Sequence, residues 1–338
     1  MDAAYIEFSA KGVVAVRTEK LSTDALQPWE TLVRNEATLV SAGTELSALH
    51  GRGAAVTYPR RTGYAAVGRI VAKGAAVDDF REGDRVFYAG KHCSAQRFLH
   101  GQDHEWGRLY PCPPGIPAAD APFGCLGRIA LTAPAITQLD LGDTVAVFGL
   151  GLVGNLAAQL YQQRGARVIG LDPVRKRCEI ARACGIDTVL DVPPRQQVEA
   201  VKDLTNGAGA QVTVDAAGHS SVITSCVKAA ALCGQVVLLG TPRVPVTMEA
   251  TEMFNDIHTR CLRMLGAHMW QFPAHDLRGA KQTVASLYRT VFDLIGTGRL
   301  KTGPLRSHFV TPAHAAEMYD GLERKQEEYW GVVFDWSA

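Results

Sequence analysis

Hydrophobic positions in the first third of the chain come in short runs that glycine, proline and charged residues interrupt. The clearest runs are GVVAV (12–16), EATLV (36–40), VGRIVA (67–72) and DRVFYA (84–89). Short alternating runs punctuated by turn residues are typical of β-strands joined by tight connections. This part of the chain is therefore predicted to be an irregular β-rich unit.

After about Leu139 the pattern changes to apolar runs that alternate with stretches of helical spacing. The predicted strands are TVAVF (144–148), ARVIGLD (166–172), QVTVDAAG (211–218) and GQVVLLG (234–240). The predicted helices are VGNLAAQLYQQRG (153–165), RKRCEIARACG (175–185) and SVITSCVKAAALC (221–233). This rhythm predicts a doubly wound parallel sheet covered by helices.

Mixed character returns from about residue 270, with a predicted helix around 278–296 and a strand at 330–336. The simplest organisation for this α/β chain is a nucleotide-binding domain inserted between two parts of a β-rich domain. We place the β-rich parts at 1–124 and 269–338, and the nucleotide-binding domain at 125–268.

A glycine pattern in FGLGLVGN supplies the strongest local signal for a ligand. Gly149, Gly151 and Gly154 form G-x-G-x-x-G directly after a predicted strand, and Leu152 and Val153 open the following helix. In that context the glycines permit a tight turn, a close approach of the backbone to a pyrophosphate and close helix–strand packing. The alternative is a glycine-rich turn without a ligand.

Further candidates for cofactor binding follow the later strands. Asp172 ends the strand after the glycine turn, where a carboxylate accepts hydrogen bonds from the adenosine ribose of NAD and repels the 2′-phosphate of NADP. Arg177 is a candidate brace for that ribose. The pairs Gly218–His219 and Gly240–Thr241 end two later strands, and ligands of open parallel sheets bind at such ends. We therefore predict NAD as the cofactor.

Composition narrows the classes of partner and compartment. The 35 basic and 34 acidic residues nearly cancel, which argues against nucleic acid and anionic membranes as partners. No run of 18 apolar residues and no signal-peptide pattern is visible, so no membrane association is expected. The eight cysteines form no C-x-x-C pair, which favours a reducing, cytoplasmic location and no structural zinc.

Several segments resemble the medium-chain dehydrogenase/reductase superfamily, the alcohol-dehydrogenase-like enzymes. They are VSAGTELSALHG (40–51), TGYAAVGRIVAKG (62–74), DDFREGDRVF (78–87) and the glycine turn. The C-terminal segment 308–336 is similar to a bacterial branch with zinc-free members and sequences like bacteriochlorophyllide a dehydrogenase. The resemblance implies a GroES-like catalytic domain, a Rossmann domain and an active site in the cleft between them. It also implies a homodimer, paired through the strand at 261–269.

Zinc-binding members of the superfamily hold their catalytic metal through a cysteine, a histidine and a third cysteine or acid. By the resemblance these positions fall on Ala42, on Tyr64, and on Gly124 or Cys125, while Ala65 stands at the glutamate that follows the histidine. Catalytic zinc usually needs three protein ligands. The region of the second, structural zinc contains only Cys93. We therefore predict no metal at either site.

Without zinc, side chains must manage the charge on the reacting oxygen. Tyr64 is the first candidate, with a packing tyrosine as the alternative. By the resemblance Thr44 links the substrate oxygen to a proton relay. Three further candidates are Glu45 beside Thr44, His50 as an outward proton carrier, and His92 as a base or substrate-orienting group. For each of them a purely structural role is equally plausible.

These observations predict an NAD-dependent, zinc-independent dehydrogenase for a polar secondary alcohol, such as a sugar or cyclitol, and its ketone. Three alternatives stay open. The first is oxidation of a hydroxyethyl group on a tetrapyrrole or other natural product. The others are an enoyl or quinone reductase and a non-catalytic dinucleotide-binding sensor.

Overall fold

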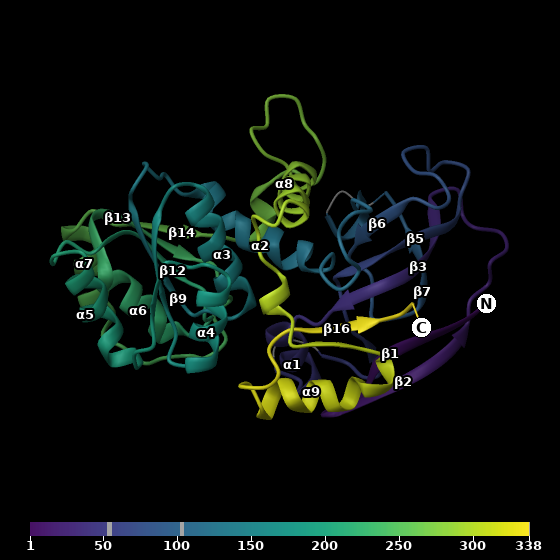
Figure 1. The fold of residues 1–338 in the computed structure, drawn as a ribbon, viewed down its shortest axis with the longest axis horizontal. Coiled ribbons are helices and arrows are strands. Elements are labelled where there is room, and N and C mark those ends of the chain that lie inside the picture. The colour runs from purple at the N-terminus through teal and green to yellow at the C-terminus, as the bar shows by residue number, and fades with distance from the viewer. Residues whose placement is uncertain (53–55, 102–104, 338) are drawn as a thin grey trace. The chain divides into compact units, whose positions relative to one another are not determined.

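The computed structural model describes residues 1–52, 56–101 and 105–337. The chain forms two compact units (Figure 1). The first comprises 1–125, 272–298 and 305–338, and the second comprises 126–271 and 299–304. The short segment 299–304 differs from the predicted boundaries, because Lys301 pairs through its backbone with the side-chain amide of Gln159 at 2.8 and 3.1 Å.

The first unit is built on two sheets, with the strand orders β2-β1-β4 and β15-β16-β3-β5-β6-β8. Strand β3 organises the larger sheet, since β5 pairs along one edge while β7 and β16 share the other. The strands are β1 (Asp2–Ala10), β2 (Val13–Lys20), β3 (Glu30–Leu39), β4 (Arg60–Arg61), β5 (Ala66–Lys73), β6 (Arg85–Tyr88), β7 (Ala95–Leu99), β8 (Leu109–Pro111), β15 (His308–Val310) and β16 (Val332–Asp335).

Three helices complete the first unit, α1 (Ala42–Leu49), α8 (Val284–Gly296) and α9 (Ala315–Arg324). Helix α8 begins at a reciprocal cap between Thr283 and Ser286, and its buried face places Tyr288 and Phe292 against Phe87. Helices α1 and α9 pack with β1, β3 and β16 in a shared apolar core. This packing brings residues from both ends of the chain together around α1.

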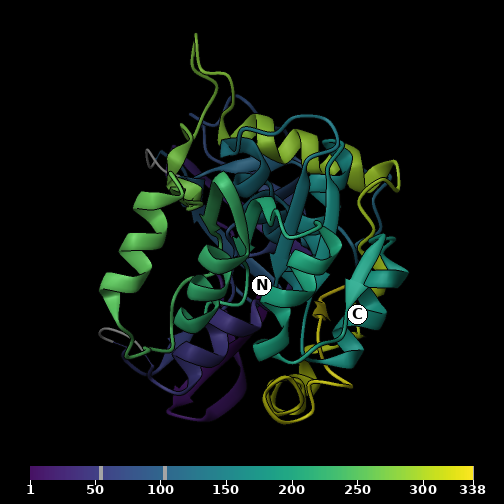
Figure 2. The same cartoon turned by 90° about the vertical axis from the view of Figure 1, so that its left-hand side faces the viewer.

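The second unit contains a six-stranded, all-parallel sheet in the order β11-β10-β9-β12-β13-β14, surrounded by helices (Figures 1 and 2). Its strands are β9 (Thr144–Phe148), β10 (Arg167–Leu171), β11 (Thr188–Leu190), β12 (Ala210–Asp215), β13 (Ala230–Leu238) and β14 (Arg263–Gly266). Its helices are α3 (Leu152–Gln163), α4 (Arg175–Ala183), α5 (Pro194–Leu204), α6 (Ser220–Ala229) and α7 (Ala250–Thr259), and α2 (Phe123–Ile136) leads into the unit.

The parallel sheet confirms the predicted doubly wound arrangement. Its strand order reverses between β9 and β12, which defines the topological switch point at which such sheets bind ligands. Strand β14, within the segment 261–269, lies at an edge of the sheet. Across the described ranges, no helix combines the length and the apolar character needed to cross a bilayer.

Candidate functional site

The glycine turn after β9 has the backbone geometry that a phosphate-binding turn needs. Gly149 adopts φ +96°, and a Cβ at Gly154 would lie 1.9 Å from the Gly149 carbonyl oxygen. A Cβ at Gly151 would meet no protein atom within 4 Å, so space is open beside this residue. Gly151 caps α3, and Leu152 and Val153 are half-buried in its first turn. The unbonded N–H groups of a helix start favour a phosphate there.

Asp172 follows β10 and holds the glycine turn through its carboxylate. It is 1% exposed, and it accepts the Leu150 N–H on Oδ2 and the Val174 N–H on Oδ1, both at 2.8 Å. The Arg177 guanidinium lies 3.5 Å from Oδ2. The predicted ribose-binding acid therefore also has a structural role at the mouth of the sheet.

The ends of β12 and β13 approach each other through glycine. A Cβ at Gly218 would lie 2.5 Å from the Thr241 carbonyl oxygen, and one at Gly240 would lie 2.4 Å from the Gly218 nitrogen. His219 is exposed, and its Nδ1 lies 2.8 Å from the Ser221 hydroxyl. The structure thus places the predicted cofactor residues after β9, β10, β12 and β13 at the carboxyl edge of one sheet.

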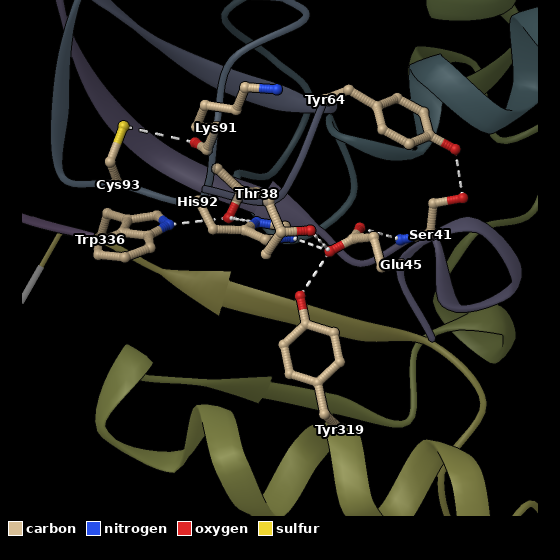
Figure 3. Close-up of polar contacts among 10 residues, drawn as sticks. Thr38, Ser41, Glu45, Tyr64, Lys91, His92, Cys93, Tyr319 and Trp336 are labelled. Atoms are coloured by element: carbon tan, nitrogen blue, oxygen red, sulfur yellow. Dashed lines mark hydrogen bonds and ion pairs between the residues drawn. The ribbon is translucent and has the colours of Figure 1, made fainter. Parts of the chain in front are cut away.

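In the first unit, Glu45 is the centre of a buried hydrogen-bond network (Figure 3). It is 2% exposed, and Oε1 accepts the Ser41 N–H at 2.7 Å. Oε2 accepts the hydroxyl of Thr62 at 2.7 Å and of Tyr319 at 2.5 Å, and lies 3.0 Å from His92 Nε2. Burial raises the pKa of Glu45, but the attraction of His92 and these hydrogen bonds outweigh it and lower the pKa to about 2.

His92 is the second buried member of this network. Its exposed fraction is 0%, and its Nδ1 lies 2.7 Å from the Thr38 hydroxyl, which also accepts the Trp336 indole N–H at 2.9 Å. Gly63 adopts φ +97°, and a Cβ there would lie 2.6 Å from the His92 nitrogen. Because both ring nitrogens are engaged, His92 and Glu45 brace α1 against β3 in this structure and offer no nitrogen or oxygen to a ligand.

Tyr64 precedes β5 and is half-buried beside the start of α1, where it donates its hydroxyl hydrogen to Ser41 Oγ (Figure 3). Its ring meets Trp106 edge to face, with centroids 5.3 Å apart. Burial raises the pKa of Tyr64 well above 10, although hydrogen bonds with the Ser41 and Thr44 hydroxyls lower it in part. Tyr64, Ser41 and Thr44 therefore form a cluster of neutral hydroxyl groups at the N-terminus of α1.

His50 lies at the opposite end of α1 from this cluster. Its Nε2 is 2.9 Å from Glu323 Oε1 of α9. The structure therefore pairs the predicted proton carrier with a carboxylate of the helix surface, and does not bring it to Tyr64.

Sequence reasoning missed the other members of the two clusters, which are Thr38, Ser41, Thr62, Tyr319 and Trp336. Ser41 lies in the segment VSAGTELSALHG (40–51), and a serine directly before a helix indicates a side-chain cap. Tyr319 lies 274 residues from Glu45, so no local pattern connects the two.

Comparison with known proteins identifies the two halves of the chain. Residues 27–119 match the family model of the alcohol dehydrogenase GroES-like domain, and residues 153–286 match that of the zinc-binding dehydrogenase. The chain therefore combines a domain of each of these two families. This result confirms the predicted combination of a GroES-like domain with a Rossmann domain.

Two curated proteins that this chain resembles are dehydrogenases by name. A zinc-type alcohol dehydrogenase-like protein from Haemophilus influenzae is 28% identical over 226 residues, which cover 60% of this chain and 66% of the relative. D-guloside 3-dehydrogenase from Escherichia coli is 27% identical over 255 residues, which cover 75% of this chain and 71% of the relative. The match thus spans about two thirds of each relative.

Two solved structures share the fold and contain a dinucleotide. One is a zinc-binding dehydrogenase from Sinorhizobium meliloti with NADP, at TM-score 0.79, 20% identity and 99% coverage of both chains. The other is an alcohol dehydrogenase from Escherichia coli CFT073 with NADH, at TM-score 0.81, 18% identity and 99% coverage of both chains. These two structures therefore show the fold that this chain shares, and one contains NADP while the other contains NADH.

The positions that correspond to the catalytic zinc ligands of the superfamily do not fit that metal here. Ala42 has no donor atom, the Tyr64 hydroxyl is bonded to Ser41, and the Cys125 sulfur lies 3.8 Å from the Tyr64 carbonyl oxygen. Among the residues that the structure describes, no three His, Cys, Asp or Glu side chains gather as metal ligands. We therefore derive no catalytic step through a metal.

Proposed function

We propose that this chain is an NAD(H)-dependent, zinc-independent dehydrogenase that interconverts a secondary alcohol of a sugar or polyol and its ketone. The observation that carries the proposal is the Tyr64 phenol held by neighbouring hydroxyl groups, at the position that the family resemblance assigns to a zinc ligand. A metal-free dehydrogenase needs such a group because the reacting oxygen must gain or lose a proton as hydride moves.

The second unit supplies the residues for the dinucleotide, which when bound carries the hydride. The turn at Gly149, Gly151 and Gly154 fits a pyrophosphate. The backbone is tightly packed at Gly154, while the space beside Gly151 is open to a ligand. Asp172 supports NAD over NADP, because its buried carboxylate would repel a 2′-phosphate.

Tyr64 manages the proton. Since its pKa is raised, the phenol is protonated at neutral pH and can donate to a carbonyl oxygen during reduction. In the oxidative direction the same group must first lose its proton and then accept that of the alcohol, as microscopic reversibility requires. The surrounding hydroxyls of Ser41 and Thr44 favour a hydroxylated substrate over an apolar one.

The substrate class draws further support from the relatives. D-guloside 3-dehydrogenase, by its name, acts on a sugar derivative, and its match covers three quarters of this chain. The proposal extends that class, and not that particular substrate, to this protein.

The experiment measures NADH formation with a panel of polyols, sugars and cyclitols, beside NADPH-dependent reduction of enones and quinones. Tyr64→Phe should lower kcat by about 10²- to 10⁴-fold without changing the Kd of NADH. Tyr329→Phe is the matched control, because its hydroxyl donates to Glu317 at 3.3 Å, outside the Tyr64 cluster. Activity should survive a chelator.

Three results would contradict the proposal. They are unchanged turnover in Tyr64→Phe, activity that chelation abolishes and zinc restores, and turnover confined to enones or quinones. Binding of NADH without turnover of any substrate in either panel would favour a sensor.

A further inference from the structure

Ser41 precedes α1 but does not cap it in the usual way. A serine at this position ordinarily accepts an N–H of the first helical turn through its side chain. Here the Ser41 side chain makes no such bond, and its own N–H is instead held by Glu45 Oε1 at 2.7 Å. The Ser41 hydroxyl is therefore fixed in place without being used by the helix.

The use of that hydroxyl is its contact with Tyr64. Tyr64 donates to Ser41 Oγ, and no acceptor within the described part of the chain takes the hydrogen of the Ser41 hydroxyl. A hydroxyl can donate and accept at once, and its hydrogen rotates about the C–O bond. The contact can therefore carry a proton in either direction once Tyr64 turns its own hydrogen toward a substrate.

We propose that Ser41 is a positioning residue that orients the Tyr64 phenol and returns a proton to it. The inference rests on the proposed function. During reduction the carbonyl carbon of the substrate gains a hydride and its oxygen takes the Tyr64 hydroxyl proton. Tyr64 takes the Ser41 proton, and Ser41 takes one from water. Each hydroxyl gives one proton and receives one, and oxidation reverses every transfer.

The electrostatics of the site determine the sign of the effect. Burial is the main cause that raises the pKa of Tyr64, and the Ser41 hydrogen bond opposes it. Ser41→Ala removes this opposition, so the pKa of Tyr64 rises further. The rise of the oxidation rate with pH should therefore move to higher pH in the variant.

The experiment compares Ser41→Ala and Ser41→Thr with the wild type. Loss of one hydrogen bond to a group that becomes charged should lower kcat about 10- to 100-fold in Ser41→Ala. The KM, the Kd of NADH and the melting temperature should stay unchanged, because the side chain makes no cap bond. Ser41→Thr keeps the hydroxyl and should restore turnover.

Three tests separate this role from a structural one. Ser47→Ala, on the same helix with its hydroxyl bonded to the Arg52 carbonyl, should leave kcat unchanged. In the Tyr64→Phe background, Ser41→Ala should cause no further loss, because the relay is already broken. A proton inventory in mixed H₂O and D₂O should be curved for the wild type and linear for Ser41→Ala.

The outcomes distinguish the role of Ser41 from the proposed dehydrogenase function. Wild-type turnover with an unchanged kcat in Ser41→Ala would overturn the role of Ser41 alone. So would a loss that persists undiminished in the Tyr64→Phe background. Absence of wild-type turnover across the panel would remove the proposed function and the role of Ser41 with it.

Discussion

Replacing Glu45 by glutamine removes one charge from the centre of the first unit while keeping the shape of the side chain. Ser41, Thr62, His92 and Tyr319 all direct a polar hydrogen or a ring nitrogen at this carboxylate. They come from the residue before α1, from the segment before β5, from the segment after β6 and from α9. The substitution therefore tests how far one buried anion stabilises the unit.

The pKa of Glu45 gives one measure of this contribution. Folding lowers the pKa from the ordinary value of 4.5 to about 2. A shift of about 2.5 units corresponds to about 3 kcal/mol. Because the folded pKa is the lower one, the contribution is complete above about pH 4.5 and is lost as the pH falls toward 2. At pH 3 less than half of it remains.

Hydrogen bonding gives a second, independent measure. A glutamine amide must turn its NH₂ group either to the Ser41 N–H or to the three groups around Oε2. The hydroxyls of Thr62 and Tyr319 can reverse and accept, but the Ser41 N–H cannot. At least one polar group is left unsatisfied or rearranged, which costs about 1–3 kcal/mol. The first measure, about 3 kcal/mol at pH 7, lies at the upper end of the second.

Urea unfolding followed by tryptophan fluorescence measures the effect. Trp336, which donates to Thr38 in the same network, reports on the first unit. Glu327→Gln is the matched control, because Glu327 is exposed. We expect Glu45→Gln to lower the free energy of unfolding of this unit by about 3 kcal/mol at pH 7, and by less than half of that at pH 3.

The reasoning fails if the two variants unfold at the same urea concentration at pH 7. It also fails if the difference between Glu45→Gln and the wild type grows as the pH falls from 5 to 3. Either result would mean that the carboxylate is not held as an anion by its four partners.

Two further predictions concern the cofactor and the acid. Gly154→Ala should destabilise the second unit, since the new Cβ would lie 1.9 Å from the Gly149 oxygen, whereas Gly151→Ala should melt like the wild type and bind NADH at least about tenfold more weakly. Thermal scans with and without NADH measure both effects. Equal melting temperatures for the two variants would contradict the prediction. The rate of alcohol oxidation should rise from pH 7 to pH 10, because the raised pKa keeps Tyr64 protonated; a rate independent of pH would contradict it.

The parallel sheet of the second unit could be predicted because its signals are local. Strand β9 is a short, mostly apolar run buried on both faces, β12 is buried along most of its length, and the glycine pattern occupies six consecutive residues. Helix α7 (Ala250–Thr259) was not predicted. None of its residues is fully buried, and Met253 and Ile257 pack against the core of the sheet while partly exposed.

The Glu45 network could be predicted only in part. The sequence raised Glu45 and His92 as candidates, but the contacts that define their roles span 17, 47 and 274 positions along the chain. The contact with Tyr319 depends on the packing of α9 against α1, and those with Thr62 and His92 depend on the segments before β5 and after β6. No pattern within any one of these segments specifies the contacts. The sequence therefore left the structural and catalytic roles of both residues open.

Ser41 shows how a correct local rule can point to the wrong partner. Serine before a helix predicts a side-chain cap, yet the carboxylate of Glu45, four residues later, binds the Ser41 N–H instead. This exchange frees the Ser41 hydroxyl for Tyr64. The contact between Ser41 and Glu45 is local in the sequence, but the contact between Ser41 and Tyr64 depends on the tertiary position of Tyr64.

The same exchange links stability to chemistry. Besides burial, which is the main cause, the negative charge of Glu45 also raises the pKa of Tyr64. The anion that stabilises the first unit therefore disfavours the phenolate and keeps a neutral donor beside it. Ser41 connects the two groups directly, since its N–H binds Glu45 while its hydroxyl accepts from Tyr64. A site arranged in this way favours proton donation to a carbonyl near neutral pH, and it releases the same proton for alcohol oxidation only as the pH rises.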